Sequence, residues 1–311
     1  MATKVVATAY GGPEVLSVVE ADVPPPTEGQ VTIDVRASAI NPMDWKVVSG
    51  AVGDDPDKLP LPVGFELAGV VSAVGPNAEG PGGAISVGDE VVAYPVQGAY
   101  ADTVTTSAAN VVPKPAELPW PEAAGVLLVG GTAAHALQVV DMKPGETLLV
   151  HGASGSVGQI AVQLAVAAGV TVIGTAGESN HELLGSYGAV PVTYGPGLAE
   201  RVREVAPGGV DAAIDTVGTD EAVDTSLELV SDRGRIVSIA AFGRADSGIV
   251  LISGDDPETH VRAEAWRTLL PAVADGSLKI AIARTYPLDE AAEALRFVRD
   301  GHAAGKVVLL P

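Results

Sequence analysis

Cysteine is absent from all 311 residues of the chain. Its absence excludes disulfide bonds, thiolate nucleophiles and zinc sites built from cysteine. It leaves the redox compartment undetermined, because a chain without cysteine is compatible with either environment. Any metal would have to be held by histidine and carboxylate side chains alone.

Positive charge is also scarce. The chain has 18 Lys and Arg against 39 Asp and Glu, which gives a formal net charge of -21 and a sequence pI near 4.4. Binding to a phosphate backbone needs a basic surface, so DNA, RNA and anionic membranes are excluded as expected partners. A well-solvated acidic exterior and a small-molecule partner are the expectation that remains.

Targeting and membrane-spanning segments are missing from the sequence pattern. The stretch MATKVVATAYGGPEVL has neither the basic start nor the long apolar run and cleavage site of a secretory signal. The apolar segment from Ala123 to Val140 is interrupted by glycines, a histidine and a glutamine. We therefore expect a soluble cytoplasmic protein.

The chain is long enough for two domains. Its pattern of apolar runs, prolines and glycines changes near residue 120. Before that point, β-branched runs such as 31–35, 68–74 and 90–93 alternate with proline and glycine, which favours a small barrel-like β domain. After it, apolar runs alternate with helical segments, which predicts a doubly wound parallel α/β sheet. The predicted strands are 147–151, 170–175, 211–215 and 235–240, and the predicted helices are 159–168, 180–187 and 219–230.

The C-terminal part predicts a helix over 258–274, a strand over 278–284, a helix over 288–299 and a strand over 306–310. These closing strands have no local partner, so the tail is expected to return to the first domain. The segment 243–257 is interpreted as a long loop with one apolar stretch, serving as a lid or subunit edge or as an ordinary connector.

A glycine-rich stretch, HGASGSVGQ, follows the predicted strand 147–151 and precedes a helix. Strand, glycine turn and helix in this order point backbone amides at an anion, as in dinucleotide-binding folds. The spacing differs from G-x-G-x-x-G, so a plain tight turn stays an alternative. The expected dinucleotide contacts are Gly152, Ser154, Gly155, Ser156, Val157 and Gly158.

The end of the next strand decides which nicotinamide cofactor is favoured. An acidic residue there would bind a free ribose 2′-OH, whereas this chain has small residues followed by Gly177, Ser179 and Asn180. Ser179 and Asn180 can donate to a 2′-phosphate, which favours NADPH. Glu178 lies beside them and keeps NADH open.

The chain resembles the zinc-free quinone oxidoreductases of the medium-chain dehydrogenase/reductase superfamily, relatives of ζ-crystallin and of plant enone reductases. The resemblance runs nearly end to end. It is carried by the segments YGGPEVL (10–16), NPMDWK (41–46), PVGFELAGVV (62–71), GAYA (98–101), AAG (123–125), the glycine loop, DTVG (215–218) and GKVV (305–308).

This resemblance implies a GroES-like β-barrel-type catalytic domain over 1–122 and 262–311, with a Rossmann-type NADPH-binding domain over 123–261 between its two parts. The active cleft is expected between the two domains. Such proteins are often homodimers, which the sequence by itself does not show.

The resemblance also implies chemistry without zinc. Zinc-dependent members have cysteine where Asn41 stands and G-H-E where this chain reads Gly64-Phe65-Glu66. A catalytic zinc normally needs three protein ligands. We expect hydride transfer from the reduced nicotinamide to a quinone, or to the C=C bond of an α,β-unsaturated carbonyl, with solvent supplying the proton.

Site residues follow from the same resemblance. Asn41 and Asp44 are expected at the nicotinamide end, with Lys46 near a ribose, and Trp45 and Phe65 as apolar walls for a ring substrate. Asn41 before a proline and Asp44 as a helix cap have ordinary structural interpretations too, and Trp45 can equally be core filler. Further cofactor contacts are expected from Thr132, Tyr194, Ala240, Ala241 and Phe242, the last three ending the last inner strand.

Other chemistries find less support. None of the five histidines has a carboxylate at a sequence spacing that would indicate a general acid. The serines of the glycine loop do not form the G-x-S-x-G motif of a nucleophilic serine. Two alternatives stay open: a 2-enoyl thioester reductase, disfavoured by the shortage of basic residues, and a nucleotide-binding protein with little catalysis, as in the crystallins.

Overall fold

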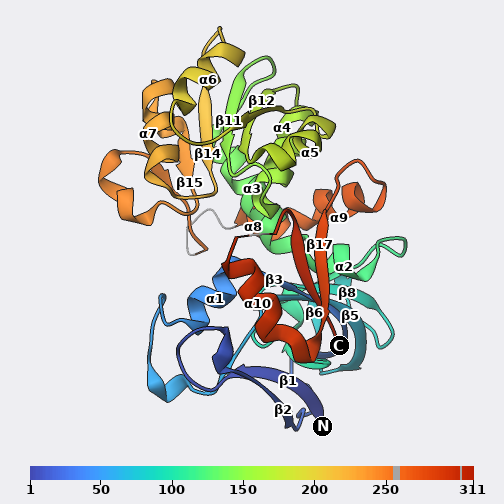
Figure 1. Cartoon of the computed structure of the whole chain (residues 1–311). Coiled ribbons are helices and arrows are strands. Elements are labelled where there is room, and N and C mark those ends of the chain that lie inside the picture. The colour runs from blue at the N-terminus through green and yellow to red at the C-terminus, as the bar shows by residue number, and fades with distance from the viewer. Residues whose placement is uncertain (255–259, 302) are drawn as a thin grey trace. The chain divides into compact units, whose positions relative to one another are not determined.

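The computed structural model describes residues 1–254, 260–301 and 303–311, and these form two compact units (Figure 1). The terminal unit comprises Met1–Leu128 and Trp266–Pro311, and the central unit comprises Val129–Ala265. None of the helices in the described ranges is long and apolar enough to span a membrane.

The terminal unit is built around a seven-stranded sheet in the order β10-β8-β5-β3-β18-β17, with β9 also paired to β3. A smaller sheet has the order β2-β1-β4, and β6 and β7 form a hairpin. The strands are β1 Ala2–Ala7, β2 Leu16–Ala21, β3 Gln30–Ile40, β4 Leu61–Pro62, β5 Glu66–Val74, β6 Glu79–Gly80, β7 Gly83–Ala84, β8 Glu90–Ala93, β9 Thr103–Ser107, β10 Val111–Pro113, β17 Ile282–Pro287 and β18 Lys306–Leu310. The helices are α1 Pro42–Val48, α2 Trp120–Ala124, α9 Trp266–Ala274 and α10 Ala291–Arg299.

The C-terminal tail returns to the first sheet, as predicted. Strand β18 pairs antiparallel with β3, where Val307 lies opposite Ile40 and Val308 opposite Ala39. Helix α10 packs through Leu295 into the same core as Ile40 and Leu309. The two ends of the chain therefore complete one hydrophobic core.

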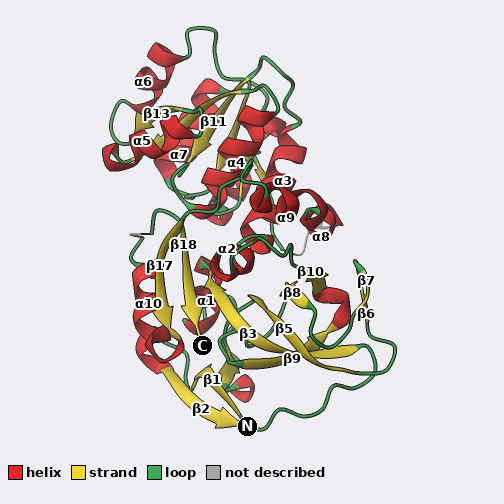
Figure 2. Cartoon of the chain, turned by 90° about the vertical axis from the view of Figure 1, so that its right-hand side faces the viewer, coloured by secondary structure: helices red, strands yellow, loops and turns green. Residues whose placement is uncertain are grey.

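The central unit is a six-stranded parallel sheet in the order β13-β12-β11-β14-β15-β16, with helices on both faces (Figure 2). The α/β class of this unit and the strand-rich first unit agree with the prediction. The strands are β11 Thr147–His151, β12 Thr171–Ala176, β13 Val190–Thr193, β14 Ala212–Asp215, β15 Ile236–Ser238 and β16 Val250–Leu251. The helices are α3 Leu127–Val140, which begins in the terminal unit, α4 Ser156–Ala167, α5 His181–Ser186, α6 Leu198–Val205, α7 Asp220–Leu229 and α8 His260–Glu264.

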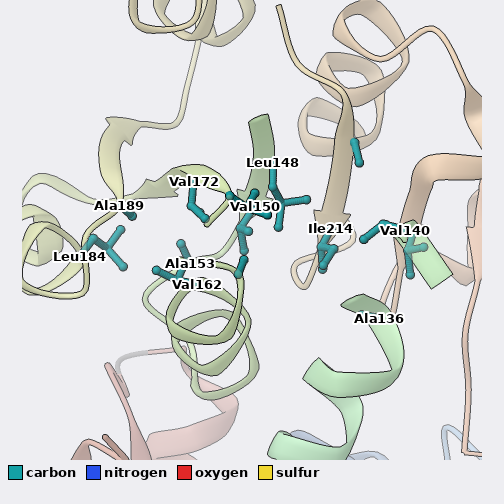
Figure 3. Close-up of a cluster of buried hydrophobic side chains, with 14 of the residues drawn as sticks. Ala136, Val140, Leu148, Val150, Ala153, Val162, Val172, Leu184, Ala189 and Ile214 are labelled. Atoms are coloured by element: carbon teal, nitrogen blue, oxygen red, sulfur yellow. The ribbon is translucent and has the colours of Figure 1, made fainter. Parts of the chain in front are cut away.

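Alternation along the parallel strands fills two hydrophobic cores. Leu148 and Val150 of β11 face one core, which α3 and α4 cover with side chains that include Ala136 and Val162 (Figure 3). Leu149, between them in sequence, faces the opposite core with Val202 of α6 and Val223 of α7. A strand buried on both faces explains why 147–151 reads as a continuous apolar run.

Several expectations about the second half of the chain were wrong in detail. The segment from Gly243 is not a plain loop: a 3-10 helix over Phe242–Ser247 leads into β16, which pairs with β15 and extends the sheet. Residues 255–257 of that segment, and 258–259 of the predicted helix, lie outside the described residues. That helix is divided at Ala265 into α8 and α9. The strand predicted over 278–284 starts only at Ile282, because the chain first closes α9 with a hydrogen bond from Leu278 N to Ala272 O.

Candidate functional site

The glycine turn, Gly152–Gly158, joins β11 to α4 at the carboxyl edge of the parallel sheet. The strand order reverses here, because β12 lies on one side of β11 and β14 on the other. In open parallel sheets, ligands bind outside the carboxyl ends at such a reversal. The glycine turn therefore lies between a strand and a helix, as the sequence pattern predicts, and at the edge of the sheet where such folds bind ligands.

Each end of this turn needs glycine for a different reason. Gly152 has φ +68, and a methyl group there would lie 2.5 Å from the Val217 side chain. A methyl group on Gly158 would lie 2.4 Å from the carbonyl oxygen of Gly152 and 2.8 Å from Cα of Ala153. With glycine at position 158, helix α4 lies closer to the end of β11 than a residue with a side chain at that position would allow.

The first turn of α4 presents backbone amides that its cap does not use. Gly155 is the N-cap residue and has no side chain to accept from them. The initial amides of a helix have no intrahelical acceptor and carry partial positive charge, so they attract anions. Ser154 and Ser156 are half-buried beside them, while Gln159 donates to the carbonyl oxygen of Ser154 at 2.6 Å and fixes the turn. The geometry fits a diphosphate.

A second set of predicted cofactor residues gathers after β12 and β13. Ser179 is exposed in a 3-10 turn that begins after Gly177, and Asn180 donates its backbone N–H to the Gly177 carbonyl at 2.9 Å. The Tyr194 hydroxyl lies 3.8 Å from where a Cβ on Gly177 would be. Arg201 donates to the carbonyl oxygens of residues 193, 195 and 196, so this arginine holds the segment that carries Tyr194.

Residues Ala240, Ala241 and Phe242 do not end a strand, contrary to the prediction. Strand β15 ends at Ser238, whose hydroxyl oxygen accepts the backbone N–H groups of Ala240 and Ala241 and turns the chain into the 3-10 helix. Phe242 is 49% exposed at the start of that helix. Thr132, the remaining predicted contact, is buried on α3.

Sequence reasoning missed the residue pair that organises this edge of the sheet. The buried Asp215 carboxylate accepts hydrogen bonds from the Ser238 hydroxyl at 2.7 Å and from the backbone N–H groups of Val217 and Gly218 at 2.9 Å. It thereby joins the turns that follow β14 and β15. An aspartate ending an apolar strand three residues before glycine was the available signal.

Two of the predicted catalytic residues, Asn41 and Asp44, belong to a group of side chains that we name the buried polar cluster. Its members are Asn41, Asp44, Glu66, Tyr100 and Lys306. The Asn41 amide nitrogen donates to Glu66 at 2.9 Å, and its oxygen accepts from Lys306 at 2.8 Å. Lys306 also donates to Glu66 at 2.7 Å, and Tyr100 donates to Asp44 at 2.8 Å. Sequence reasoning placed Asn41 and Asp44 here but missed the other three.

Asp44 has the capping role that its position suggested. Its carboxylate accepts the backbone N–H of Asn41 at 2.6 Å, which caps α1. Burial raises the pKa of Asp44 to about 7, although the hydrogen bonds from Asn41 and Tyr100 and the charge of Lys306 act in the opposite direction. Burial, followed by the nearby Asp44 charge, also raises the pKa of Tyr100. The second oxygen of Asp44 accepts no hydrogen bond from any described residue.

The other predicted residues lie around this cluster. Trp45 is half-buried and packs against the hydrophobic core of the terminal unit that contains Val48. Lys46 and Phe65 are likewise half-buried. Across the described part of the chain, no three His, Cys, Asp or Glu side chains converge as metal ligands.

Comparison with known proteins identifies the family. Residues 27–139 match the family described as alcohol dehydrogenase GroES-like domain, and residues 188–309 match the one described as zinc-binding dehydrogenase. Quinone oxidoreductase 1 of Escherichia coli is 31% identical over 100% of both chains. The chain belongs to the quinone oxidoreductase family of the medium-chain dehydrogenase/reductase superfamily.

Two further relatives of this family cover nearly the whole chain. Human quinone oxidoreductase is 32% identical over 97% of this chain and 95% of its own length. The crystal structure of E. coli quinone oxidoreductase complexed with NADPH has a TM-score of 0.88 at 30% identity, covering 99% of this chain and 100% of that chain. The predicted family and fold class are therefore confirmed.

Because backbone atoms lie so close to Gly158, we predict that adding a methyl group there destabilises the protein, whereas adding one at an open glycine does not. Gly158→Ala should lower the free energy of unfolding by about 1 to 3 kcal/mol, because backbone atoms must move to admit the methyl group. Gly185→Ala on α5 is the matched control, since its methyl group meets nothing within 4 Å and should leave stability unchanged or slightly higher. Urea unfolding of both variants checks this, and equal effects would contradict the packing argument.

Beneath the glycine turn, His151 predicts a pH dependence of stability. Its Nε2 lies 3.1 Å from the Ser226 hydroxyl, and burial lowers the pKa of His151 to about 4. Its unfolded form binds a proton below about pH 6.5, so stability should be lost as pH falls from 6.5 towards 4. We expect His151→Gln to reduce that loss by on the order of 1 to 3 kcal/mol, measured by urea unfolding across this range. An unchanged pH slope would show that another group is responsible.

Proposed function

We propose that this chain is an NADPH-dependent oxidoreductase that reduces quinones, or the C=C bond of α,β-unsaturated carbonyls, without zinc. Within this proposal the cofactor supplies a hydride when bound. The protein binds and orients the dinucleotide, and solvent supplies the proton. The observation that carries the proposal is the glycine turn, whose close packing at Gly158 aims unused helix amides at a diphosphate.

The adenosine end of the cofactor is assigned to Gly177, Ser179, Asn180 and Tyr194. These residues follow adjacent parallel strands, and β12 itself ends in the small uncharged residues Thr175 and Ala176, with Glu178 the first acidic residue after it. Ser179 and Asn180 supply donors for a 2′-phosphate, which favours NADPH over NADH. The related E. coli structure was determined with NADPH, which supports the same choice.

The substrate side of the reaction is assigned to Asn41 and Asp44, with Trp45 and Phe65 as apolar surfaces and Lys46 near a ribose. The donor set in this region is poorly suited to zinc, because the amide of Asn41 and the Glu66 carboxylate are joined by the Lys306 ammonium. A cation that is part of the protein repels a second cation at the same point. Hydride acceptance by an electron-poor carbon needs positioning and a favourable field more than a Lewis acid.

Turnover assays with purified protein test the reaction class. We expect NADPH to be consumed with 1,4-benzoquinone, 9,10-phenanthrenequinone or a small enone, because each offers an electron-poor acceptor. Loss of NADPH absorbance is the measurement. A marked preference for a 2-enoyl thioester would favour the thioester reductase instead, and cofactor binding without turnover on any acceptor would favour a nucleotide-binding protein.

Cofactor choice has its own test in the double variant Ser179→Ala with Asn180→Ala. We expect the Kd for NADPH to rise by about tenfold or more, because donors to a charged phosphate are lost, while the Kd for NADH changes little. Ser186→Ala is the control, since this exposed hydroxyl on α5 donates to the carbonyl oxygen of Leu183 at 2.7 Å. Fluorescence titration measures both cofactors, and equal losses would refute the 2′-phosphate assignment.

A further inference from the structure

Lys306 begins β18, and its ammonium lies inside the terminal unit with three acceptors for three N–H bonds. They are Glu66 Oε1 at 2.7 Å, Asn41 Oδ1 at 2.8 Å and the Ile40 carbonyl oxygen at 3.4 Å. The Lys306 side chain is 2% exposed and that of Glu66 is 0% exposed. Removing a charge from water in this way costs free energy, which raises the question of what this buried ion pair does in the protein.

The strand register places this ammonium beside Asn41. Val307 lies opposite Ile40 in the antiparallel pairing of β18 with β3, so the residue before Val307 lies opposite the residue after Ile40. Space for the lysine stem depends on Gly125, where a methyl group would lie 3.1 Å from Lys306 Cγ. Backbone pairing and a missing side chain thus fix the position of the ammonium.

The buried pair determines which way the Asn41 carboxamide points. Lys306 can only donate, so it requires the carboxamide oxygen, and the Glu66 carboxylate accepts, so it requires the carboxamide nitrogen. Rotating the carboxamide by half a turn would oppose the amide nitrogen to the ammonium and the amide oxygen to the carboxylate. Both contacts would then be repulsive, so a single orientation is stable.

We propose that Lys306 is a positioning residue for the reaction: together with Glu66 it locks the orientation of Asn41. Among the described residues, the second amide hydrogen of Asn41 has a single acceptor, the Ala39 carbonyl oxygen at 3.5 Å, and a hydrogen bond of that length is weak. A fixed carboxamide with one weakly bound hydrogen is a donor prepared for a carbonyl oxygen. This inference rests on the proposed function, in which Asn41 acts on the substrate side.

Glu66 also contacts the start of α3, and this second contact helps to hold its carboxylate in place. Glu66 Oε2 accepts the backbone N–H of Leu128 at 3.0 Å, while Oε1 accepts from Asn41 and Lys306. Each carboxylate oxygen of Glu66 is therefore used. Asp44, Tyr100 and Glu66 are the titratable groups of the cluster around Lys306, and no other cation of the described residues donates to any of these three side chains.

Lys306→Met tests the proposal because it keeps the length of the side chain and removes its donors. We expect kcat with a quinone to fall by about tenfold or more while the KM for NADPH stays within about twofold, because misorienting one catalytic donor costs rate more than cofactor binding. Lys306→Arg, which retains the charge, should recover part of the lost kcat.

The matched control is Lys114→Met. Lys114 is the other buried lysine of the described residues, with a side chain 2% exposed and its ammonium 2.8 Å from Glu90. This substitution should lower thermal stability as a broken ion pair does, yet leave kcat within about twofold at equal folded fraction. A kcat for Lys306→Met equal to that of Lys114→Met would overturn the proposal.

The double variant Lys306→Met with Glu66→Gln separates positioning from stability. Removing both charges should restore thermal stability without restoring kcat, because neither side chain then fixes the Asn41 carboxamide. Recovery of kcat together with stability would show a merely structural role and would overturn the proposal. This variant also decides the question if Lys306→Met alone fails to fold.

A readout independent of turnover keeps this inference distinct from the proposed function. The side-chain amide signals of Asn41 in 15N-labelled protein can be assigned from their loss in Asn41→Asp. We expect slow hydrogen exchange for the hydrogen bonded to Glu66, and faster exchange in Lys306→Met but not in Lys114→Met. Absence of turnover in the unmodified protein would overturn the proposed function alone, whereas unchanged exchange in Lys306→Met would overturn the lock.

Discussion

The antiparallel pairing of β18 with β3 is the constraint on which the rest of the terminal unit depends. It adds the last strand of the chain to a sheet that begins near residue 30, and it carries the parallel partner β17 with it. Helix α10 packs into the same hydrophobic core as these strands, and Leu295 of α10 and Leu309 of β18 are fully buried there. Without this pairing, the hydrophobic core and the buried polar cluster would both lose one side.

The glycine turn and the buried polar cluster use electrostatics in different ways. In the central unit, the glycine turn offers partial charge from backbone dipoles, with Asp215 holding the neighbouring turns in place. In the terminal unit, full charges are buried, and each is matched by hydrogen bonds. Partial charges on the backbone suit reversible binding of an anion. Buried and fully hydrogen-bonded charges suit a side chain that must keep one orientation.

The sequence predicted the local elements well where periodicity and glycine act over short distances. Strands 147–151 and 306–310 agree with β11 and β18, because apolar runs flanked by turn residues have few alternative conformations. The strand end at Ser238 was missed, because a side-chain hydroxyl there replaces the next sheet hydrogen bonds. Asn41 and Asp44 came from the family resemblance. Glu66, Tyr100 and Lys306 were missed because a single sequence does not reveal contacts across 25 to 265 residues.

The span of those contacts has a consequence for how the protein is made. During synthesis, residues 129–265 leave the ribosome before 306–310 exist, so the parallel sheet can form while the first sheet still lacks β18. Until then the free edge of β3 and the Glu66 carboxylate have neither partner strand nor counterion. The nascent chain can therefore form its parallel sheet early, and it completes the buried polar cluster only when β18 has emerged.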